Sequence, residues 1–480
     1  MKRFDLVSAI KDPKVLKPYF PKGLETWKNW ITFFKVLSGG YKLSDEEMAL
    51  FRECTGLHEL PEKGSIKEVF LVIGRRGAKS TAAAILAVFY ALWGNWENYL
   101  SPGEVARIFI IACNKDQGQI IMRYIKAIFD LPMFKDKLKR PLTESIELKN
   151  GVHIEIKPAS WRSTRGFSVG LFIMEELAYW RFEVESQTRD KEIYTALKPS
   201  TSTIKNSLII GISTPFARQG LLYEKDERHF GKPGPVLLWK APTWVMNETL
   251  TKEQLEDEYL ETMGENEFNA EFAVRYREDI EQYLPLEVID RAIVKGRQSI
   301  PSQSGVNYVA FCDPSEGLRK GGDSMTFAVA HTEEDQEERY IIDVLLEFVP
   351  PFEPKSVISD IAAVCEDYDI DRIVQDRHAI AWIASDFEEY GIIVETADKV
   401  KSDIYELFAV EMNRGVVELP DYDRLRNQLM GLQRFVRSGG AKIDHLRGGH
   451  DDCVNSCAGA MILAKERGGV GSLADRIEWI

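Results

Sequence analysis

A glycine-rich turn between an apolar strand and an apolar helix is the feature that most limits how this chain can fold. Residues 71–81 read LVIGRRGAKST, and residues 81–92 are rich in alanine and other apolar side chains. The backbone N–H groups of such a turn, together with the positive end of a helix dipole, can surround phosphate oxygens. The stretch therefore predicts an α/β fold with a phosphate-binding loop, although a glycine-rich stretch with a lysine also arises by chance.

The turn supplies most of the predicted nucleotide-binding residues. Lys79 is expected to reach the β- and γ-phosphates and Ser80 to ligate Mg²⁺. Gly74 and Gly77 are expected to permit the turn, whereas Ala78 stands directly before the lysine, where the usual signature has glycine. The predicted ATP-binding residues are Gly74, Arg75, Arg76, Gly77, Ala78, Lys79, Ser80, Thr81 and, from a later strand, Glu175.

A second apolar strand, residues 169–176, ends in the carboxylates Glu175 and Glu176. A phosphate-loop hydrolase needs this pair, because the first acid holds the Mg²⁺ shell and the second orients and deprotonates the attacking water. Aspartate is commoner at the first position, so we expect the longer Glu175 to hold the metal through water. A solvated acidic turn is the alternative, but the residues before the pair are almost uncharged.

Other side chains near the predicted loop could detect the γ-phosphate. Arg75 and Arg76 lie within the loop itself. A third apolar strand, SLIIGISTP at 207–215, ends in small hydroxyl groups that would lie beside the acids. A simple exit from strand to turn explains these hydroxyls equally well.

The composition is that of a large enzyme with two or three domains. The 480 residues are 44% hydrophobic and 28% charged, so the chain can build sizeable cores. No apolar run reaches the roughly 18 residues that a membrane span needs, and the first residues lack a signal-peptide core. Six cysteines in mostly apolar or helical contexts favour reduced thiols in a cytosolic protein. The net charge of −14 argues against indiscriminate coating of nucleic acid but allows a local basic face.

The pattern of elements changes near residue 300. Alternation of strands and helices predicts strands near 68–74, 106–114, 153–159, 170–176 and 207–215. Beyond the stretch 296–305, which is rich in Gly, Ser and Pro, three successive strands precede alternating helices and strands. The predicted parts are a helical segment with a candidate adenine-pocket lid at 1–60, a P-loop ATPase domain of ASCE type with a mostly parallel sheet at 61–250, a helical subdomain and linker at 251–305, and a ribonuclease H-like mixed-sheet nuclease domain at 306–480.

Acidic residues of the second half fall where a ribonuclease H-like fold gathers its active site. Asp313 ends the first strand, Asp376 ends the fourth, and Asp451 and Asp452 open the last long helix. Carboxylates that converge there can hold two metal ions, one to activate water and one to stabilise the leaving 3′-oxygen. An aspartate at one strand end is usually a turn cap, but acids at all three of these places predict a nuclease. The predicted metal ligands are Asp313, Asp376, Asp451, Asp452 and, in the loop, Ser80, with Asp323 as a further or outer acid.

A phosphate-loop motor joined to a ribonuclease H-like nuclease resembles the large terminase subunit of tailed bacteriophages, a DNA-packaging ATPase and nuclease. The resemblance covers almost the whole chain, and the stretches that carry it are GRRGAKS at 74–80, EELAYW at 175–180, STP at 213–215, Asp313-Pro, Asp376 and HDD at 450–452. It implies ATP and Mg²⁺ as cofactors, with Mn²⁺ as an alternative in the nuclease site.

The same resemblance implies partners and a place of action. It implies a homo-oligomeric ring that pumps double-stranded DNA through the portal protein and works with a small terminase subunit. The place of action is the host cytoplasm and, transiently, the portal vertex of the procapsid, with no membrane and no retention in the virion. Arg165 matches an arginine that family members offer to a neighbour's nucleotide, which can accelerate phosphoryl transfer by about 10³–10⁵. Binding to a helix C-terminus or to a surface acid is the alternative role of Arg165, and Arg162 is a competing candidate.

Two other functions fit parts of this pattern. An ATP-dependent helicase-like nuclease of DNA repair or restriction would need a second motor domain, for which residues 216–300 are too short. A portal-docking protein with decayed sites would have lost Lys79 or the acids, and none is lost. We therefore expect an ATPase coupled to DNA translocation and a metal-dependent endodeoxyribonuclease that cuts concatemeric DNA. The predicted catalytic residues are Glu176, Arg165, Asp313, Asp376, Asp451 and Asp452.

Overall fold

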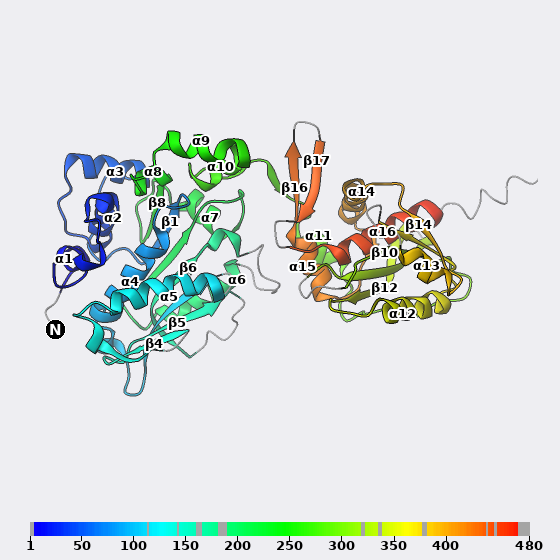
Figure 1. Ribbon diagram of the computed structural model, residues 1–480, viewed down its shortest axis with the longest axis horizontal. Helices are drawn as coiled ribbons and strands as arrows, with labels where there is room; N and C mark the ends of the chain where they lie inside the picture. The colour runs from blue at the N-terminus through cyan, green and yellow to red at the C-terminus, as the bar shows by residue number, and fades with distance from the viewer. Residues whose placement is uncertain are drawn as a thin grey trace, which may run out of the picture. The chain divides into compact units, whose positions relative to one another are not determined.

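A computed structural model of the chain describes residues 4–112, 115–141, 144–159, 166–180, 190–317, 322–334, 338–376, 382–437, 440–445 and 449–468. The chain divides into two units, Met1–Glu278 (unit 1) and Asp279–Ile480 (unit 2), each with its own sheets and core (Figure 1). Within the described ranges, no helix combines the length and the apolar character that crossing a lipid bilayer requires.

Unit 1 is built on a mostly parallel sheet with the strand order β3-β4-β5-β2-β6-β7-β1-β8. Strand β7 lies between β1 and β6 and is parallel to both, so the carboxyl ends of these three strands meet at one edge of the sheet. Among the described strands of this sheet, antiparallel pairing occurs only between β3 and β4 and between β4 and β5. The strands are β1 (Glu68–Ile73), β2 (Ala106–Ala112), β3 (Leu138–Pro141), β4 (Ser145–Leu148), β5 (His153–Pro158), β6 (Ser168–Glu175), β7 (Leu208–Ser213) and β8 (Val236–Ala241).

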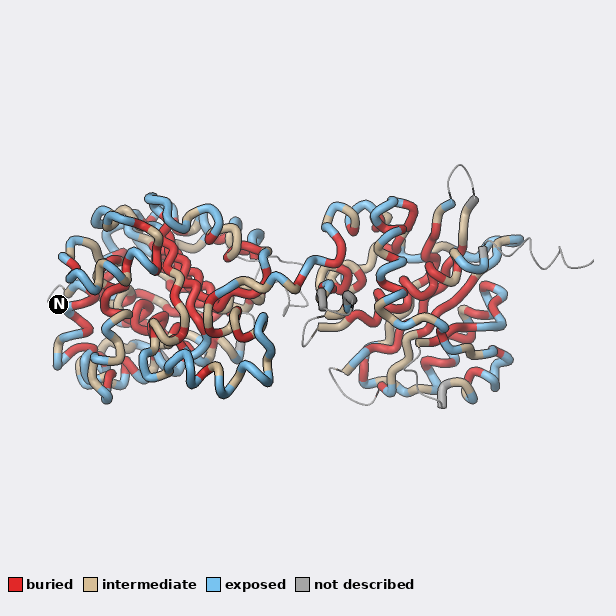
Figure 2. Tube along the Cα trace, turned by 90° about the horizontal axis from the view of Figure 1, so that it is seen from above, coloured by how far each residue is buried: buried red, intermediate tan, exposed pale blue. Residues whose placement is uncertain are grey.

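Apolar helices cover the sheet of unit 1. Helix α4 follows β1 directly, and its run from Ala82 to Val88 is buried, so its small side chains pack closely on the strands. Strand β1 is buried along its whole length, as a strand covered on both faces should be, and such buried strands form the centre of the unit in Figure 2. The helices are α1 (Leu6–Lys11), α2 (Lys28–Ser38), α3 (Asp45–Thr55), α4 (Lys79–Trp93), α5 (Lys115–Phe129), α6 (Asp190–Leu197), α7 (Gly220–His229), α8 (Thr243–Met246), α9 (Lys252–Met263) and α10 (Glu265–Glu271).

Unit 2 has a mixed sheet with the strand order β14-β13-β10-β11-β12-β15 and a smaller sheet with the order β17-β16-β9. Strands β10, β11 and β12 pair antiparallel in succession, whereas β13 and β14 join β10 in parallel. The first and fourth strands of the larger sheet are therefore neighbours at its centre. The strands are β9 (Ile280–Gln282), β10 (Val309–Asp313), β11 (Met325–Glu334), β12 (Glu338–Phe348), β13 (Arg372–Gln375), β14 (Ile393–Thr396), β15 (Val417–Glu418), β16 (Leu432–Arg437) and β17 (Gly440–His445).

Helix α16 (Asp452–Gly468) packs on the central strands β10, β11 and β12 of unit 2. Gly459 is required where the helix meets β10, because a Cβ there would lie 2.4 Å from the ring of Phe311. This close packing fixes the position of Asp452 at the start of the helix. The other helices of the unit are α11 (Leu286–Ala292), α12 (Pro354–Asp367), α13 (Trp382–Glu388), α14 (Lys401–Arg414) and α15 (Asp423–Gly431).

The fold class predicted from the sequence is confirmed: unit 1 has the mostly parallel sheet with a strand between the loop strand and the acid strand, and unit 2 has the ribonuclease H-like strand order. The five predicted strands of the first half correspond to β1, β2, β5, β6 and β7. The sequence pattern predicts no strand at β3, β4 or β8; β3 and β4 are short and partly charged, so no apolar run marks them. The finer division of the chain into four parts stays a prediction.

Candidate active sites

The predicted phosphate loop joins the end of β1 to the start of α4 in unit 1. Lys79 is the first residue of α4, and Ala78 precedes it in the left-handed conformation, with φ at 64°. Trp30 of α2 donates its indole N–H to the carbonyl oxygen of Gly77 over 3.0 Å. The N-terminal helical segment therefore contacts the loop directly.

Left-handed backbone conformations in the loop fall on Arg76 and Ala78 and not on its glycines. The angle φ is 65° at Arg76 and 64° at Ala78. A Cβ on Gly77 would lie 2.6 Å from Ile73 Cγ2 and 2.8 Å from the carbonyl oxygen of Gly74. Glycine is thus needed at position 77 for close approach of the backbone within the turn.

Lys79 and Ser80 face the two carboxylates that end β6. The Nζ atom of Lys79 lies 3.7 Å from Oε1 of Glu176, and the Lys79 side chain is buried. The Ser80 hydroxyl donates to Oε1 of Glu175 over 2.6 Å. The lysine and the hydroxyl belong to one sequence motif, and the acid pair belongs to another. In the structure the two motifs lie together at one edge of the sheet.

One oxygen of Glu175 is available to a cation. Its Oε2 atom is buried and has no hydrogen-bond partner within the described part of the chain. Burial raises the pKa of Glu175 to about 7; the adjacent Glu176 acts in the same direction, and Ser80 and Lys79 oppose it. A carboxylate oxygen beside a hydroxyl is a donor set that suits Mg²⁺, so these residues fit the predicted metal.

Hydroxyl groups at the end of β7 contact the acid pair and the turn behind it. Ser213 donates to Oε2 of Glu176 over 3.2 Å and accepts the backbone N–H of Ala178 over 3.2 Å. Glu176 itself has a left-handed backbone, with φ at 48°, and strained non-glycine residues of this kind cluster at functional sites. The end of β7 therefore contacts the acid pair through Ser213, and a simple exit from strand to turn does not account for these hydrogen bonds.

The remaining predicted residues of unit 1 lie at the rim of the loop or outside the described ranges. The Arg75 side chain is 56% exposed and lies 3.8 Å from the carboxylate of Glu271, a residue that no sequence motif marks. Arg76 is exposed, and Thr81 is half-buried in the first turn of α4. Arg165 and its competitor Arg162 lie outside the described residues, so the catalytic arginine stays a prediction.

Asp313 and Asp376 lie on neighbouring strands of unit 2, at the carboxyl ends of β10 and β13. The preceding residues Cys312 and Gln375 are register partners, and the Asp376 N–H donates to the Cys312 carbonyl oxygen over 3.3 Å. Asn455 of α16 donates its side-chain amide to Oδ2 of Asp376 over 2.8 Å. Sequence analysis missed Asn455, although its spacing of three from Asp452 on one helix could have indicated a shared face.

Asp451 and Asp452 are adjacent in sequence but have different partners. Asp451 accepts hydrogen bonds from Lys401 over 2.8 Å and from the Tyr405 hydroxyl over 2.9 Å. Asp452 accepts the backbone N–H of Ser324 over 2.9 Å. The sequence pattern does not distinguish the two acids, whereas in the structure each is buried and accepts hydrogen bonds from different donors.

Asp323, the predicted outer acid, lies beside Asp452. Its Oδ1 atom is 3.1 Å from Nδ1 of His450, and the same nitrogen is 4.0 Å from Oδ2 of Asp452. One ligand atom from each of these three residues falls within 4.8 Å of the others, as metal ligands would. A second group with this property consists of Asp444, His445 and Asp451.

The carboxylates of unit 2 influence one another electrostatically. Burial raises the pKa of Asp313 to about 8, and Asp452 and Asp376 add to the rise, against the effects of Lys401 and Asn455. Burial also raises the pKa of Asp452 to about 6.

Oδ1 of Asn455 is buried with no hydrogen-bond partner among the described residues. Carboxylate and amide oxygens suit Mg²⁺ and Mn²⁺, so the residues fit the predicted metal ions.

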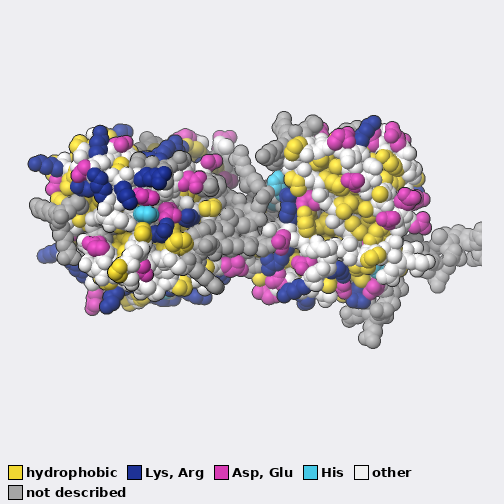
Figure 3. All heavy atoms as spheres, turned by 90° about the horizontal axis from the view of Figure 1, so that it is seen from below, with side chains coloured by type: hydrophobic (Ala, Val, Ile, Leu, Met, Phe, Trp, Pro, Cys, Tyr) yellow, Lys and Arg dark blue, Asp and Glu magenta, His cyan; other side chains and the backbone are white. Residues whose placement is uncertain are grey.

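Basic side chains of unit 2 are engaged by acids in several places. Arg424 lies 3.1 Å from Glu347, and Arg426 lies 2.7 Å from Asp290. On the face of the molecule in Figure 3, Lys and Arg side chains are interspersed with Asp and Glu in both units. Arg424 and Arg426 therefore already have acidic partners within unit 2.

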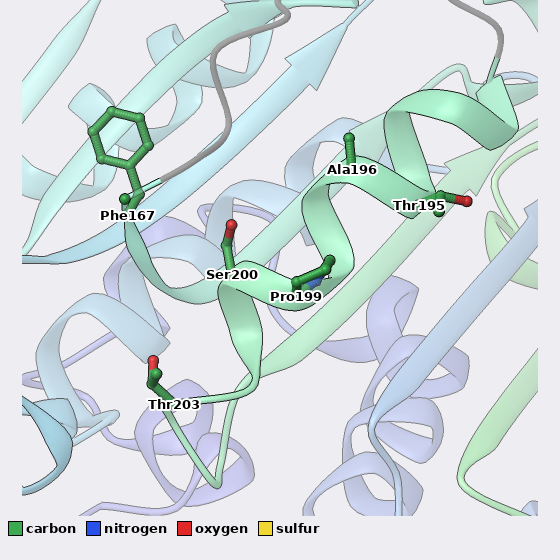
Figure 4. A pocket seen from close by; sticks show the side chains of 7 residues that line it. Phe167, Thr195, Ala196, Pro199, Ser200 and Thr203 are labelled. Atoms are coloured by element: carbon green, nitrogen blue, oxygen red, sulfur yellow. The ribbon is translucent and has the colours of Figure 1, made fainter.

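A pocket of about 490 Å³ in unit 1 is lined by other residues than those of the two sites. Its lining includes Phe167 just before β6, Thr195 of α6, and Ser200 and Thr203 of the segment after α6 (Figure 4). Its described lining contains no charged side chain, so it offers no acid or base for catalysis.

Comparison with solved structures finds large terminases of bacteriophages. The HK97 large terminase is 14% identical, with coverage of 86% of this chain and 98% of that chain and a TM-score of 0.36. The large terminase ATPase domain of Thermus phage P74-26 is 21% identical over 51% of this chain and 96% of that chain, with a TM-score of 0.33. The G20c large terminase nuclease with bound magnesium is 20% identical over 37% of this chain and 95% of that chain, with a TM-score of 0.31. No protein-family model and no curated protein matches the sequence. The chain is thus similar in structure to large terminases of phages, in comparisons that include separate ATPase and nuclease domains.

Proposed function

We propose that the chain is an ATP-driven DNA-packaging motor subunit that also cuts DNA with a metal-dependent endonuclease. The observation that carries the proposal is the meeting of Lys79 and Ser80 with Glu175 and Glu176 at one edge of a parallel sheet. A buried lysine, a hydroxyl and two carboxylates are the groups that hydrolysis of a nucleoside triphosphate requires.

In unit 1 the loop backbone and Lys79 bind the β- and γ-phosphates of ATP, and Ser80 and Glu175 hold Mg²⁺. When bound, Mg²⁺ supplies positive charge that stabilises the transferring phosphoryl group. Glu176 would orient the attacking water and accept its proton. Its place beside Lys79 puts it near the position expected for the γ-phosphate, and the Ser213 hydroxyl holds its carboxylate in place.

In unit 2 the metal ligands are Asp313, Asp376 and Asp452, and Asn455 positions Asp376. Bound Mg²⁺ or Mn²⁺ ions supply the Lewis acidity for attack of water on a phosphodiester and for departure of the 3′-oxygen. Asp451 belongs to the same acidic site, but its hydrogen bonds to Lys401 and Tyr405 make it the outer member of the set.

The proposed partners follow from the proposed role in DNA packaging. The subunit would form a homo-oligomeric ring on the portal protein, receive concatemeric double-stranded DNA with the help of a small terminase subunit, and act in the host cytoplasm at the procapsid. Arg165 is the candidate for insertion into the neighbouring subunit's nucleotide site. Backbone contacts, and not base contacts, would hold DNA that has to slide.

Separate loss of the two activities tests the proposal. Lys79→Ala and Glu176→Gln should abolish ATP hydrolysis and leave Mn²⁺-dependent cutting of plasmid DNA measurable, because the affected groups lie in unit 1. Asp376→Ala should abolish cutting and leave ATP hydrolysis. The controls are Lys22→Ala and Asp371→Ala, which change exposed residues of the same charge in each unit. Equal loss of both activities from a change in either site would refute the assignment of separate sites.

A further inference from the structure

A pocket of about 200 Å³ lies in unit 2 between α16 and the larger sheet that contains β10 and β14 (Figure 1). Its lining is largely apolar and includes the buried side chains of Phe311 on β10, Val374 on β13 and Ile462 on α16. Phe311 and Val374 stand two residues before Asp313 and Asp376, and side chains two residues apart share one face of a strand. The pocket therefore lies next to the candidate nuclease site, but its described lining includes none of the four acids.

Exposed apolar side chains continue the surface of this pocket. Glu395 of β14 lines the pocket, and Ile393, two residues earlier on the same face of the strand, is 50% exposed. Val400, which follows the lining residues of the loop after β14, is 42% exposed. Strand β14 is also an edge of the larger sheet, and sheet edges are commonly covered by another segment. The pocket and its surroundings thus offer a surface for an apolar segment of polypeptide.

Helix α16 leads the chain directly to this surface. Arg467, near the end of α16, lines the pocket and donates to the Glu395 carboxylate over 2.9 Å. The chain continues from there into residues 469–480, which lie outside the described residues. Residues 468–472 read GGVGS, and glycines permit a sharp reversal of chain direction. Five such residues span up to about 17 Å, so the residues that follow can reach the pocket.

The sequence after these glycines matches the surface in polarity and charge. Leu473, Ile477 and Ile480 are spaced by four and three positions, which is the spacing of one apolar helix face. Arg476 stands next to Ile477. Asp398, an exposed acid that lines the pocket, forms no salt bridge within the described part of the chain. An apolar edge with an adjacent arginine therefore complements an apolar pocket with an adjacent acid.

We propose that residues 473–480 dock on this pocket of the same chain, with Ile477 in the pocket and Arg476 beside Asp398. Because a short glycine-rich linker joins the segment to α16, its effective concentration at the pocket is roughly millimolar, so a weak contact is enough to keep it docked. The docked segment covers the edge of the sheet at β14 and packs beside the candidate nuclease site. This interaction needs neither ATP hydrolysis nor DNA cutting by the chain.

Fluorine NMR of the full chain labelled with 5-fluorotryptophan follows the segment through Trp479. The variant Trp479→Phe identifies the resonance of this residue. In the wild type the resonance should lie away from that of a free peptide with the sequence of residues 469–480, and Ile477→Asp should move it to the free position. Ala474→Asp introduces the same charge off the apolar spacing and should leave the resonance as it is in the wild type. Coincidence of the wild-type and free resonances would overturn the proposal.

Binding of the same peptide, labelled with fluorescein, tests the pocket side. The full-chain variant Ile477→Asp should bind it at least about tenfold more tightly than the wild type, whose own segment competes for the pocket. Adding Thr396→Arg, a change at an exposed lining residue, should abolish this binding. Adding Ser302→Arg, at an exposed serine outside the lining, should leave the binding intact. Equal affinities of the wild type and Ile477→Asp, or unchanged binding with Thr396→Arg, would contradict docking at this pocket.

A second copy of the chain is the other possible source of the segment. Sedimentation velocity over a range of concentrations distinguishes the two cases, because docking within one chain requires no association. Self-association of the wild type that Ile477→Asp abolishes would show that a neighbouring copy supplies the segment, and it would overturn docking within one chain. A wild type that shows the shifted Trp479 resonance and no such association would support the proposal.

Discussion

Trp30 of α2 donates its indole N–H to the carbonyl oxygen of Gly77 across 3.0 Å and so ties the N-terminal helical segment to the phosphate loop. Trp30 is completely buried, and its ring packs against Phe33 and Phe34 of the same helix. The bond fixes the peptide that joins Gly77 to Ala78. A residue far from the loop in sequence therefore helps to set the orientation of the loop N–H groups that we propose to bind the nucleotide.

Trp30→Phe should weaken ATP binding and lower the free energy of unfolding. The ring is largely kept, but a buried carbonyl oxygen that loses its donor costs about 1–3 kcal/mol, and this cost falls on the loop. Titration with a fluorescent ATP analogue and urea unfolding measure the two effects. Trp27→Phe is the matched control, because it removes a nearby indole and leaves the Trp30–Gly77 bond in place. Equal loss of ATP affinity in both variants would contradict the role of this bond.

Local signals made part of each site predictable. Glu175 and Asp313 each stand at the end of an apolar strand, and Lys79 opens the helix that follows another such strand. Parallel strands bring their carboxyl ends together, so sequence order is enough to group Lys79 with Glu175 in unit 1 and Asp313 with Asp376 in unit 2. Trp30 and Glu271 carry no such signal, because Trp30 lies within α2 and Glu271 ends α10, and neither follows an apolar strand. Their hydrogen bonds with Gly77 and Tyr179 arise only from the tertiary fold.

The different surroundings of Asp451 and Asp452 also could not be predicted from the sequence. Neighbouring residues in a sequence have the same pattern of charge and polarity around them. The packing of α16 on β11 places Ser324 beside Asp452, and the packing of α14 against α16 places Lys401 beside Asp451. The predicted acid set was therefore obtainable from the sequence, whereas the role of each member required the tertiary structure.

Ala78→Gly should leave the stability of unit 1 unchanged or raise it by up to about 1 kcal/mol. An L-residue at φ of 64° is strained by about 1–2 kcal/mol, and the entropy that glycine loses on folding offsets only part of the relief. Ala82→Gly is the control inside α4, where the backbone is right-handed, and it should cost about 1 kcal/mol or more. Urea unfolding measures both variants. Destabilisation of the same size at both positions would show that strain at Ala78 is negligible.

Metal binding by unit 2 should strengthen as the pH rises toward 8. Burial raises the pKa of Asp313 to about 8, so its carboxyl group is mostly protonated at neutral pH, and a cation must displace that proton. For one displaced proton the Mn²⁺ affinity should rise by up to about tenfold per pH unit below this pKa and level off above it. In the metal-free protein the sign is the opposite: the contribution of Asp313 to stability is complete below its ordinary pKa and is lost as the pH rises through about 8.

Calorimetry in two buffers of different ionisation enthalpy measures this proton release together with the affinity. Asp371→Asn, a change at an exposed acid just before β13, should leave the pH dependence as it is in the wild type. Metal affinity that stays constant over the same pH range would show that Asp313 binds the cation without losing a proton, or does not bind it.

Lys401→Met should move the pH dependence of metal binding to higher pH. The Lys401 ammonium donates to Asp451 over 2.8 Å, and its charge lowers the pKa of Asp313, so its removal should raise that pKa further. Methionine keeps most of the length of the side chain, which limits the loss of packing. Lys399→Met, at a more exposed lysine that pairs with Glu466, should leave the titration midpoint unchanged. A midpoint that moves to lower pH in Lys401→Met would mean that the ammonium competes with the cation for the acids more than it assists their ionisation.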